Sequence, residues 1–192
     1  MATSTSKLQH KSWTKGPYLI STDPSLIPVQ TLNAWFATEE VYWAHPMPEE
    51  AMREALLNSL CFGMYFNPSA QLTHTASDSL DPEFIGIARC ITDFTTFIYL
   101  TDVFILPSYQ GSGLGTWLMS CVQEIIEGMQ YLRRSLLFTG DWKRSVPFYK
   151  KTMDMHVMHS KPPTEGKDAE GLAVMVRLGK GAPSYQRNLK IL

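Results

Sequence analysis

The sequence predicts an α/β domain, and three observations lead to this expectation. Apolar runs of strand length alternate with segments of helical periodicity along the chain. One apolar run, which ends at Leu106 and Pro107, passes through a glycine-rich turn into a segment whose apolar residues share one helical face. That face comprises Leu114, Leu118, Cys121, Val122 and Ile125. The chain has 192 residues, 44% of them hydrophobic, which is enough for one domain with a sizeable core.

We expect a single folded domain between two tails. Residues 1–16 are small and polar and are interpreted as a flexible N-terminal tail. The domain covers residues 17–178, and residues 179–192 form a basic, loose C-terminal tail. The chain has no internal repeat and no linker long enough to divide it.

The first part of the domain is expected to contain a short strand and two helices. The strand covers residues 18–20, and Asp23 with Pro24 marks the start of the first helix. The apolar positions of this helix are Leu26, Ile27, Leu32, Trp35 and Phe36. The second helix opens at residues 48–50, where a proline and two acids suit a first turn, and runs to about residue 59.

The middle of the chain is expected to supply the centre of the sheet. Buried strands are predicted at residues 60–66, 84–92 and 97–106, with a polar hairpin loop at 67–82. Arg89 and Asp93 are charges in or beside this apolar sheet. Because buried charges usually need partners, we expect a structural pairing, with Asp102 on the neighbouring strand as a candidate partner. The alternative is a direct role in substrate binding.

The remaining elements follow the glycine-rich turn. A long helix runs to about residue 130, and residues 134–139 form another strand. A further helix begins at Asp141. Residues 155–158 and 172–178 form a terminal hairpin around a loop at 161–166.

Composition excludes several functions. A net charge of −1 and a pI of about 6.5 argue against nucleic acid as the main partner, because phosphate binding needs a basic surface. Cys61, Cys90 and Cys121 lie in apolar runs and are interpreted as buried, reduced thiols of a cytoplasmic protein. No spacing suggests a metal site, no secretory signal is expected, and no run is long enough to span a membrane.

The glycine-rich turn is the strongest candidate for chemistry. A helix that begins beside glycines presents bare amides, and glycine lets a phosphate group approach the backbone closely. The Walker A motif is excluded because no lysine follows Gly113 or Gly115. The dinucleotide-binding motif is excluded because these glycines are spaced differently and lie past the middle of the chain. The alternative is a turn between strand and helix that binds no ligand.

The pattern that fits is Gln or Arg, two residues, Gly, one residue, then Gly or Ala, and here it is met by Gln110, Gly113 and Gly115. Together with YLTDVFILPSYQGSGLG, the upstream IGIARCITDF and a later Phe-Tyr pair, it resembles the acyl-CoA pyrophosphate loop of the GNAT superfamily of N-acetyltransferases, in a bacterial and fungal branch. The resemblance covers residues 17–178. It implies a mixed, mostly antiparallel sheet flanked by helices, with one splayed parallel strand pair.

The resemblance also implies acetyl-CoA as the cofactor and indicates the residues that bind it. The splayed strand holds the pantetheine and the acetyl oxygen through free backbone groups, here at Val103, Phe104 and Ile105. Loop residues expected to bind the diphosphate are Gln110, Gly111, Ser112, Gly113, Leu114, Gly115 and Thr116. Further contacts are expected from Trp142, Ser145, Phe148, Tyr149 and Lys151.

Tyr149 matches the superfamily tyrosine placed next to the CoA sulfur, and we expect it to be the general acid. A phenol can donate a proton to a departing thiolate. The alternative is a tyrosine that only packs its helix. Asp154 and Met155 stand where the superfamily usually has Gly-Phe or Gly-Met, so the end of this helix departs from the pattern. Aspartate takes the left-handed cap conformation less readily than glycine.

The acceptor side is expected to involve Glu40, Tyr42, Trp43 and Tyr99. Aromatic rings and carboxylates suit an amine through cation–π contact and charge pairing. The alternative is that the ring of Trp43 caps the core and the glutamates are solvated. The general base stays open among Glu39, Glu40, His45 and a water chain. Strand alternation puts Asp102 on the face opposite Tyr99, and in relatives with a base on this strand the matching position is Tyr99.

We therefore expect an acetyl-CoA-dependent N-acetyltransferase acting on a primary amine of a small molecule. The partners expected are acetyl-CoA and the amine acceptor, with no nucleic acid and no membrane, in a monomer or homodimer. Two other functions stay open. One is a non-catalytic acyl-CoA-binding or sensor protein, and the other is a protein or peptide N-acetyltransferase.

Overall fold

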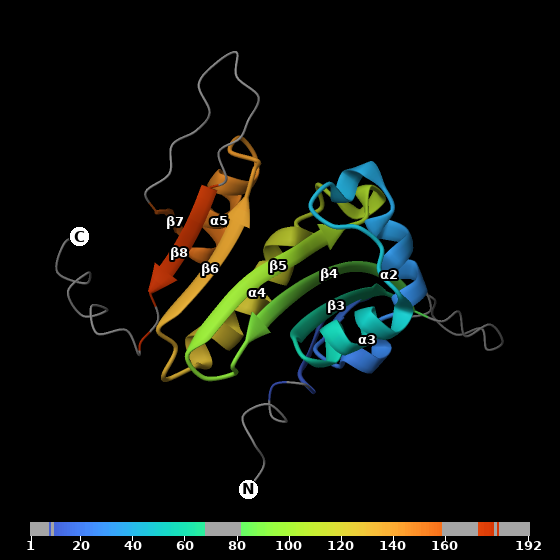
Figure 1. Cartoon of the computed structure of the whole chain (residues 1–192), viewed down its shortest axis with the longest axis horizontal. Coiled ribbons are helices and arrows are strands. Elements are labelled where there is room, and N and C mark those ends of the chain that lie inside the picture. The colour runs from blue at the N-terminus through green and yellow to red at the C-terminus, as the bar shows by residue number, and fades with distance from the viewer. Residues whose placement is uncertain (1–7, 9, 68–81, 159–172, 179, 181–192) are drawn as a thin grey trace, which may run out of the picture. The chain divides into compact units, whose positions relative to one another are not determined.

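The fold contains a mixed eight-stranded sheet, seen here in a computed structural model that describes residues 8, 10–67, 82–158, 173–178 and 180 (Figure 1). The strand order is β1-β2-β3-β4-β5-β6-β8-β7. The strands are β1 (Ser12–Lys15), β2 (Tyr18–Ser21), β3 (Leu60–Phe66), β4 (Glu83–Thr92), β5 (Phe97–Ile105), β6 (Arg134–Thr139), β7 (His156–Val157) and β8 (Ala173–Leu178). β5 and β6 run parallel, whereas the other registered pairs are antiparallel. The predicted α/β fold, with its mostly antiparallel sheet and one parallel pair, is confirmed.

Four α-helices can be given bounds within the described residues. They are α2 (Val29–Phe36), α3 (Glu49–Leu57), α4 (Leu114–Gly128) and α5 (Ser145–Met153), with short 3-10 turns η1 (Pro24–Leu26), η2 (Glu39–Val41) and η4 (Pro107–Tyr109). The chain divides into two compact units. The first unit consists of Met1–Cys90 with Asp102–Leu118, and the second consists of Ile91–Thr101 with Met119–Leu192.

The core of the first unit lies where α2 and α3 pack against the strands. Trp35 of α2 stacks on Phe84 of β4, with ring centroids 4.5 Å apart and planes 5° from parallel. Leu32, Met52 and Leu56 of the two helices are almost fully buried. Burying such a side chain stabilises the fold by about 2 kcal/mol. The full cluster is Ile27, Val29, Leu32, Trp35, Phe36, Val41, Met52, Leu56, Cys61, Tyr65, Phe84, Ile87 and Phe104.

Two expectations for the start of the chain are wrong. Ser12–Lys15 is a strand paired with β2 and not part of a tail, and the ring of Trp13 stacks on Phe62 at 5.9 Å. The helix predicted from Asp23 is interrupted, because its carboxylate caps only the 3-10 turn η1. Pro28 lacks an N–H and holds the preceding residue in an extended conformation, so α2 begins at Val29.

In the second unit, β6 pairs with the first half of β5, and β8 and β7 follow β6 in the sheet. Ser135, Leu137 and Thr139 of β6 are buried, while Arg134 and Phe138 are exposed. This alternation shows that one face of the strand is covered. Helices α4 and α5 lie on one side of these strands (Figure 1). The buried face of α4 includes every position that periodicity predicted.

Asp93 closes the turn between β4 and β5 instead of joining the buried ion pair. Its Oδ1 accepts hydrogen bonds from the amides of Thr95, Thr96 and Phe97, at 3.0, 2.7 and 3.0 Å. Burial of the carboxylate opposes its charge, but the hydrogen bonds from Thr96, Thr95 and Phe97 outweigh burial and hold the pKa of Asp93 well below its usual range. The turn is thus fixed by one side chain, next to Phe94 with φ of +58°.

The helix expected from Asp141 begins four residues later. The carboxylate of Asp141 accepts from the amides of Lys143 and Arg144, at 3.1 and 2.8 Å, and so forms a turn ahead of Ser145. At the other end, Asp154 takes the left-handed cap conformation, with φ of 51° and ψ of 35°. Aspartate therefore adopts the left-handed cap conformation at the position where the superfamily pattern has glycine.

Several other boundaries match the sequence closely, and some segments cannot be compared. β3 and β6 have the predicted bounds, and α3 and β5 differ from prediction by one or two residues. The predicted loops at 67–82 and 161–166 fall largely or wholly outside the described residues. So does the predicted C-terminal tail, apart from Lys180.

Candidate cofactor and acceptor sites

The loop between β5 and α4 has a backbone that requires glycine. Gly111 and Gly113 have φ of +78° and +82°, a region that other residues rarely adopt. A Cβ added at either position would meet no atom within 4 Å. Backbone conformation, and not crowding, therefore demands these two glycines.

Side-chain hydrogen bonds fix the shape of this loop. Gln110 Nε2 donates to the carbonyl oxygen of Ile105 at 2.7 Å, and Ser112 Oγ donates to that of Tyr109 at 2.9 Å. Tyr109 Oη donates to Glu83 Oε2 at 2.6 Å, and this hydrogen bond, with burial, raises the pKa of Tyr109 to about 12. The side chain of Gln110 is thus used to support the turn. If Gln110 contributes to diphosphate binding, as expected from the sequence, it would do so through its backbone.

The backbone N–H groups of residues 111–116 are the chemical feature of the loop. For the described residues, no protein acceptor takes a hydrogen bond from any of them. The first backbone bond at this end of α4 is donated by the amide of Trp117 to the carbonyl of Gly113, at 3.1 Å. Open amides at the start of a 15-residue helix carry partial positive charge and suit an anion. These residues fit the diphosphate that the sequence analysis anticipated.

The strand ahead of the loop carries three further candidates. Val103 is half-buried, and Phe104 and Ile105 are buried at the end of β5. Registered pairs between β5 and β6 end at Tyr99 with Leu136, so residues 103–105 lie beyond the last of them. This matches the expectation that backbone groups of 103–105 are not used in pairing with β6.

Asp102 is held by an ion pair in the first unit. Its Oδ2 accepts from Arg89 Nε at 2.6 Å, and Arg89 Nη1 donates to Ser59 Oγ at 3.1 Å. Ser59 Oγ in turn donates to the carbonyl of Ala55 in α3, at 2.6 Å. The expected pairing is confirmed. Asp102 also has a left-handed backbone with φ of 48° inside β5, a conformation that aspartate and asparagine tolerate better than most residues.

Tyr149 and its neighbours belong to the second unit. Tyr149 lies in α5 and is 9% exposed, and its ring meets the ring of Phe148 edge-on at 5.1 Å. The carbonyl of Tyr149 accepts the N–H of the cap residue Asp154. The backbone of Tyr149 thus takes part in the hydrogen bond that closes the C-terminal end of α5.

The other cofactor candidates of the second unit differ in their secondary structure and in their burial. Trp142 lies in the turn ahead of α5, not in the helix, and is half-buried. Ser145 is the first residue of α5 and its amide donates to the carbonyl of Asp141 at 3.1 Å. Lys151 is exposed, and Phe148 is half-buried.

A hollow of about 530 Å³ lies at the connection between α2 and α3 in the first unit. Glu39, Tyr42 and His45 contribute to its lining, but Glu40 and Trp43 do not. The ring of Trp43 instead meets that of Tyr42 edge-on at 5.1 Å. The remaining lining residues are Phe36, Ala37, Thr38, Val41, Ala44 and Pro46.

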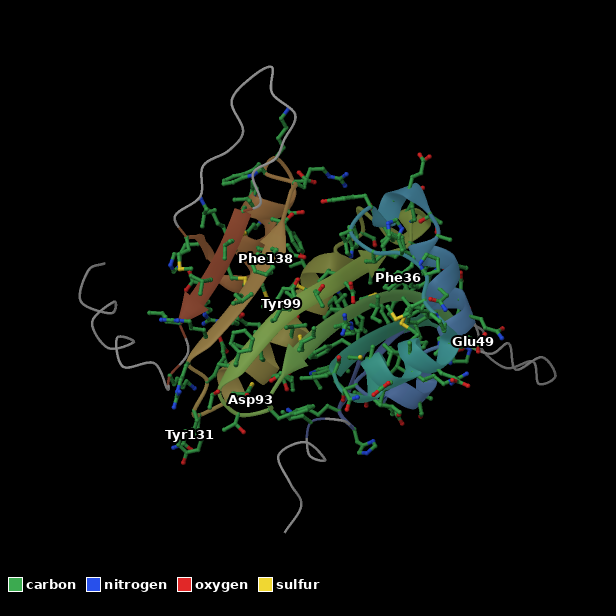
Figure 2. The ribbon with its side chains drawn as sticks, in the orientation of Figure 1. Phe36, Glu49, Asp93, Tyr99, Tyr131 and Phe138 are labelled. Atoms are coloured by element: carbon green, nitrogen blue, oxygen red, sulfur yellow. The ribbon has the colours of Figure 1, made fainter. Side chains whose placement is uncertain are left out.

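Tyr99, the fourth acceptor candidate, lies on β5 in the second unit. Its ring meets Phe138 of β6 at 5.4 Å, with planes at 62° (Figure 2). The sequence did not predict this contact, because only the pairing of β5 with β6 brings the two rings together. It also missed the apolar lining of the hollow, which has no pattern of its own in the sequence.

Other chemistries find little support in the part of the chain that is described. No group of three or more His, Cys, Asp or Glu residues there could hold a metal ion. No helix of the described residues is both long and apolar enough to cross a bilayer. Cys61, Cys90 and Cys121 are free and buried, and burial raises the pKa of Cys61 and Cys121 to about 12 and 11. Burial raises the pKa of Cys90 as well.

Comparison with known proteins gives consistent matches. Residues 30–155 match the model of the acetyltransferase (GNAT) family. A Gibberella zeae protein, provisionally named an acetyltransferase, is 42% identical over 135 residues, which are 68% of this chain and 76% of that protein. A Xanthomonas campestris structure, provisionally described as a GNAT-family acetyltransferase, is 31% identical with a TM-score of 0.52, covering 69% of this chain and 82% of that one.

A more distant structure shares the fold alone. Spermidine N-acetyltransferase from Vibrio cholerae, solved with CoA and spermine, is 10% identical with a TM-score of 0.60. The match covers 87% of this chain and 98% of that one.

Replacing Asp102 tests the ion pair that anchors β5. Asp102→Asn leaves the guanidinium of Arg89, only 19% exposed, without a counter-charge, and should destabilise the protein by roughly 3 kcal/mol. Asp102→Ala should cost about 1 kcal/mol more, because alanine tolerates the left-handed conformation less well than asparagine. Urea unfolding followed by circular dichroism measures both changes.

The matched control is the exposed ion pair between Arg53 and Glu49, 3.8 Å apart on α3 (Figure 2). Glu49→Gln should change stability by less than about 0.5 kcal/mol. If Asp102→Asn were as mild as this control, the pair would not be an anchor.

Proposed function

The chain belongs to the acetyltransferase (GNAT) family, a family of N-acetyltransferase enzymes, and from that premise we propose that it acetylates the primary amine of a small molecule with acetyl-CoA. The observation that carries the proposal is the loop at residues 111–116, whose amides have no protein acceptor within the described chain and stand at the start of α4. Such a loop suits a diphosphate. CoA, the cofactor anticipated from the sequence, carries one.

The cofactor supplies an acetyl group activated as a thioester. In the proposal, the amides of Gly111 to Thr116 hold the diphosphate through hydrogen bonds. A backbone N–H among Val103, Phe104 and Ile105 donates to the acetyl oxygen and stabilises the charge that develops there. Support for this role comes from the position of these residues beyond the last registered pair of β5 with β6.

We propose direct transfer to the amine, without an acetylated cysteine. A cysteine nucleophile acts as the thiolate, and nucleophilic cysteines have lowered pKa values. All three cysteines of the chain are buried with raised pKa values, including about 12 for Cys61. The nitrogen of the acceptor would therefore attack the acetyl carbon directly, the C–S bond would break as the C–N bond forms, and the thiolate of CoA would leave.

Tyr149 is proposed as the acid that protonates the departing thiolate. The Phe-Tyr pair in α5 matches the superfamily pattern, and the left-handed Asp154 ends the helix at the position where that pattern has glycine. The proton of the ammonium leaves through Glu39, His45 or water. Glu39 and His45 are favoured among the side chains because both line the hollow, whereas Glu40 does not.

The acceptor is proposed to be a small amine because the hollow of about 530 Å³ combines a carboxylate with an aromatic ring. Glu39 would pair with the ammonium, and the ring of Tyr42, 64% exposed, offers it a π face. A peptide acceptor and a sensor without turnover are the two alternatives. Thiol release from acetyl-CoA in a panel of amines and peptides separates all three.

Replacing Tyr149 with phenylalanine tests the proposed acid. Tyr149→Phe should lower kcat for an accepted amine by about 100-fold or more, because general acid catalysis typically contributes that much. The KM for acetyl-CoA should change little, since the ring stays in place. Thiol release measured from pH 6 to pH 10 gives both constants.

Tyr131→Phe is the control, because Tyr131 is also in the second unit but 63% exposed and away from Tyr99 and Phe138 (Figure 2). It should leave kcat unchanged. A Tyr149→Phe enzyme that keeps kcat within twofold of wild type would remove this tyrosine from the chemistry.

The adjacent glutamates provide a matched test of the acceptor site. Glu39→Gln should raise the KM for the amine by about tenfold, corresponding to ~1.4 kcal/mol of lost charge pairing. Glu40→Gln should change that KM by less than about twofold, because Glu40 does not line the hollow. Equal effects of the two substitutions on KM would argue against the hollow as the acceptor site.

A further inference from the structure

The connection between α2 and α3 is closed by the side chain of Asn33 in α2. Asn33 Nδ2 donates to the carbonyl oxygen of Met47 at 2.8 Å, and the N–H of Met47 donates to Asn33 Oδ1 at 3.2 Å. Both groups of one amide side chain thus bond to a residue 14 positions further along the chain. The residues that line the hollow, from Phe36 to Pro46, all lie within the segment that these two hydrogen bonds close.

Backbone hydrogen bonds inside this connection reach only three residues. The amide of Thr38 donates to the carbonyl of Trp35 at 3.0 Å. The amides of Val41 and Ala44 each donate at 3.3 Å to the carbonyl three residues earlier. These bonds form a succession of turns, but they tie no residue after Ala44 back to α2. Asn33 therefore fixes the far end of the connection.

The floor of the hollow is continuous with the core beside the end of β5. Phe36 and Val41 line the hollow and are only 4% and 1% exposed. Both belong to the hydrophobic cluster that contains Phe104, and the rings of Trp35 and Phe104 lie 5.3 Å apart. Phe104 is one of the residues proposed to hold the acetyl group. All these residues belong to the first unit, so the two proposed binding sites share one packed core.

The lining of the hollow suits an amine with a single charge. Among the described residues that line it, Glu39 is the only carboxylate. The hydroxyl of Thr38 already donates to the carbonyl of Trp35, at 2.7 Å. Alanine, valine, phenylalanine and proline side chains supply most of the remaining wall. A second ammonium group inside the hollow would have no carboxylate to pair with, and burying an unpaired charge is costly.

We propose that the hollow takes an amine with one ammonium group on a compact apolar body, and that Asn33 is the positioning residue that holds the hollow in shape. This inference rests on the proposed function. Asn33 does not line the hollow and acts through the connection, because its two hydrogen bonds hold Glu39 and the ring of Tyr42 in place before the amine arrives. A connection released from α2 would have to be ordered at each binding event, which weakens binding.

The test uses phenethylamine and spermidine as the amines. Thiol release from acetyl-CoA gives kcat and KM, and an NMR titration of the protein with phenethylamine gives a Kd without turnover. Wild type should use phenethylamine at least about tenfold more efficiently than spermidine, whose further ammonium groups find no carboxylate in the hollow. Asn33→Ala should raise both the KM and the Kd for phenethylamine about fivefold or more, because binding must then order the connection. The kcat and the KM for acetyl-CoA should stay within about twofold of wild type, a split that a general loss of structure would not produce.

Asn58→Ala is the matched control. Asn58 is an exposed asparagine of the first unit that follows α3 and does not line the hollow, so its replacement should leave every constant unchanged. Thermal unfolding of each variant shows whether it remains folded, and Asn33→Ser serves if Asn33→Ala does not.

Turnover that favours spermidine, or a KM for phenethylamine insensitive to the loss of Asn33, would overturn the inference while leaving the proposed function standing. Absence of turnover with every amine would overturn the proposed function. The Kd of phenethylamine for wild type and for Asn33→Ala would then still decide whether the hollow takes this amine and whether Asn33 shapes it.

Discussion

Two left-handed glycines control how the chain leaves its central strand. Gly111 and Gly113 turn the backbone from β5 into α4, and neither is needed to make room for a neighbour. The result is a helix that starts with its amides turned to no protein acceptor in the described chain. Unpaired amides and the helix dipole favour the same kind of ligand, an anion with several acceptor oxygens.

The surroundings of the loop hold it in place from both sides. Arg89 and Asp102 tie β5 to β4 and, through Ser59, to α3. Tyr109 and Glu83 join the turn after β5 to the start of β4, and Gln110 returns to the last residue of β5. Loop, ion pair and hollow all belong to the first unit. Tyr149, Tyr99 and Phe138 belong to the second unit.

The sequence was most informative where one local signal decided the structure. β3 is a continuous apolar run and β6 alternates between buried and more exposed residues, and the bounds of both strands were predicted correctly. The loop was found because its glycine spacing is specific. Prediction failed where two local signals competed, as at Pro28, which interrupts a helix that Asp23 appeared to begin. At Asp141, a capping side chain formed a turn before the helix.

The lining of the hollow was predicted only in part, because it depends on tertiary packing. The residues lining the hollow lie close in sequence, yet only the fold shows that Glu39 lines it and Glu40 does not. The ring contact between Tyr99 and Phe138 was not predicted either, because Phe138 lies two residues beyond Leu136, the strand partner of Tyr99. β1 was missed because a polar edge strand such as Ser12–Lys15 lacks a strong apolar alternation.

The most direct measurement is calorimetric titration of CoA and of pantetheine, which lacks the diphosphate, into wild type and Gly113→Ala. CoA should bind far more tightly than pantetheine, because only CoA presents a diphosphate to these amides. Gly113→Ala, which strains a left-handed residue, should weaken CoA binding at least about tenfold while leaving pantetheine binding unchanged. Equal affinity for the two ligands, or no detectable CoA binding by wild type, would contradict the claim that the amides of residues 111–116 hold a diphosphate.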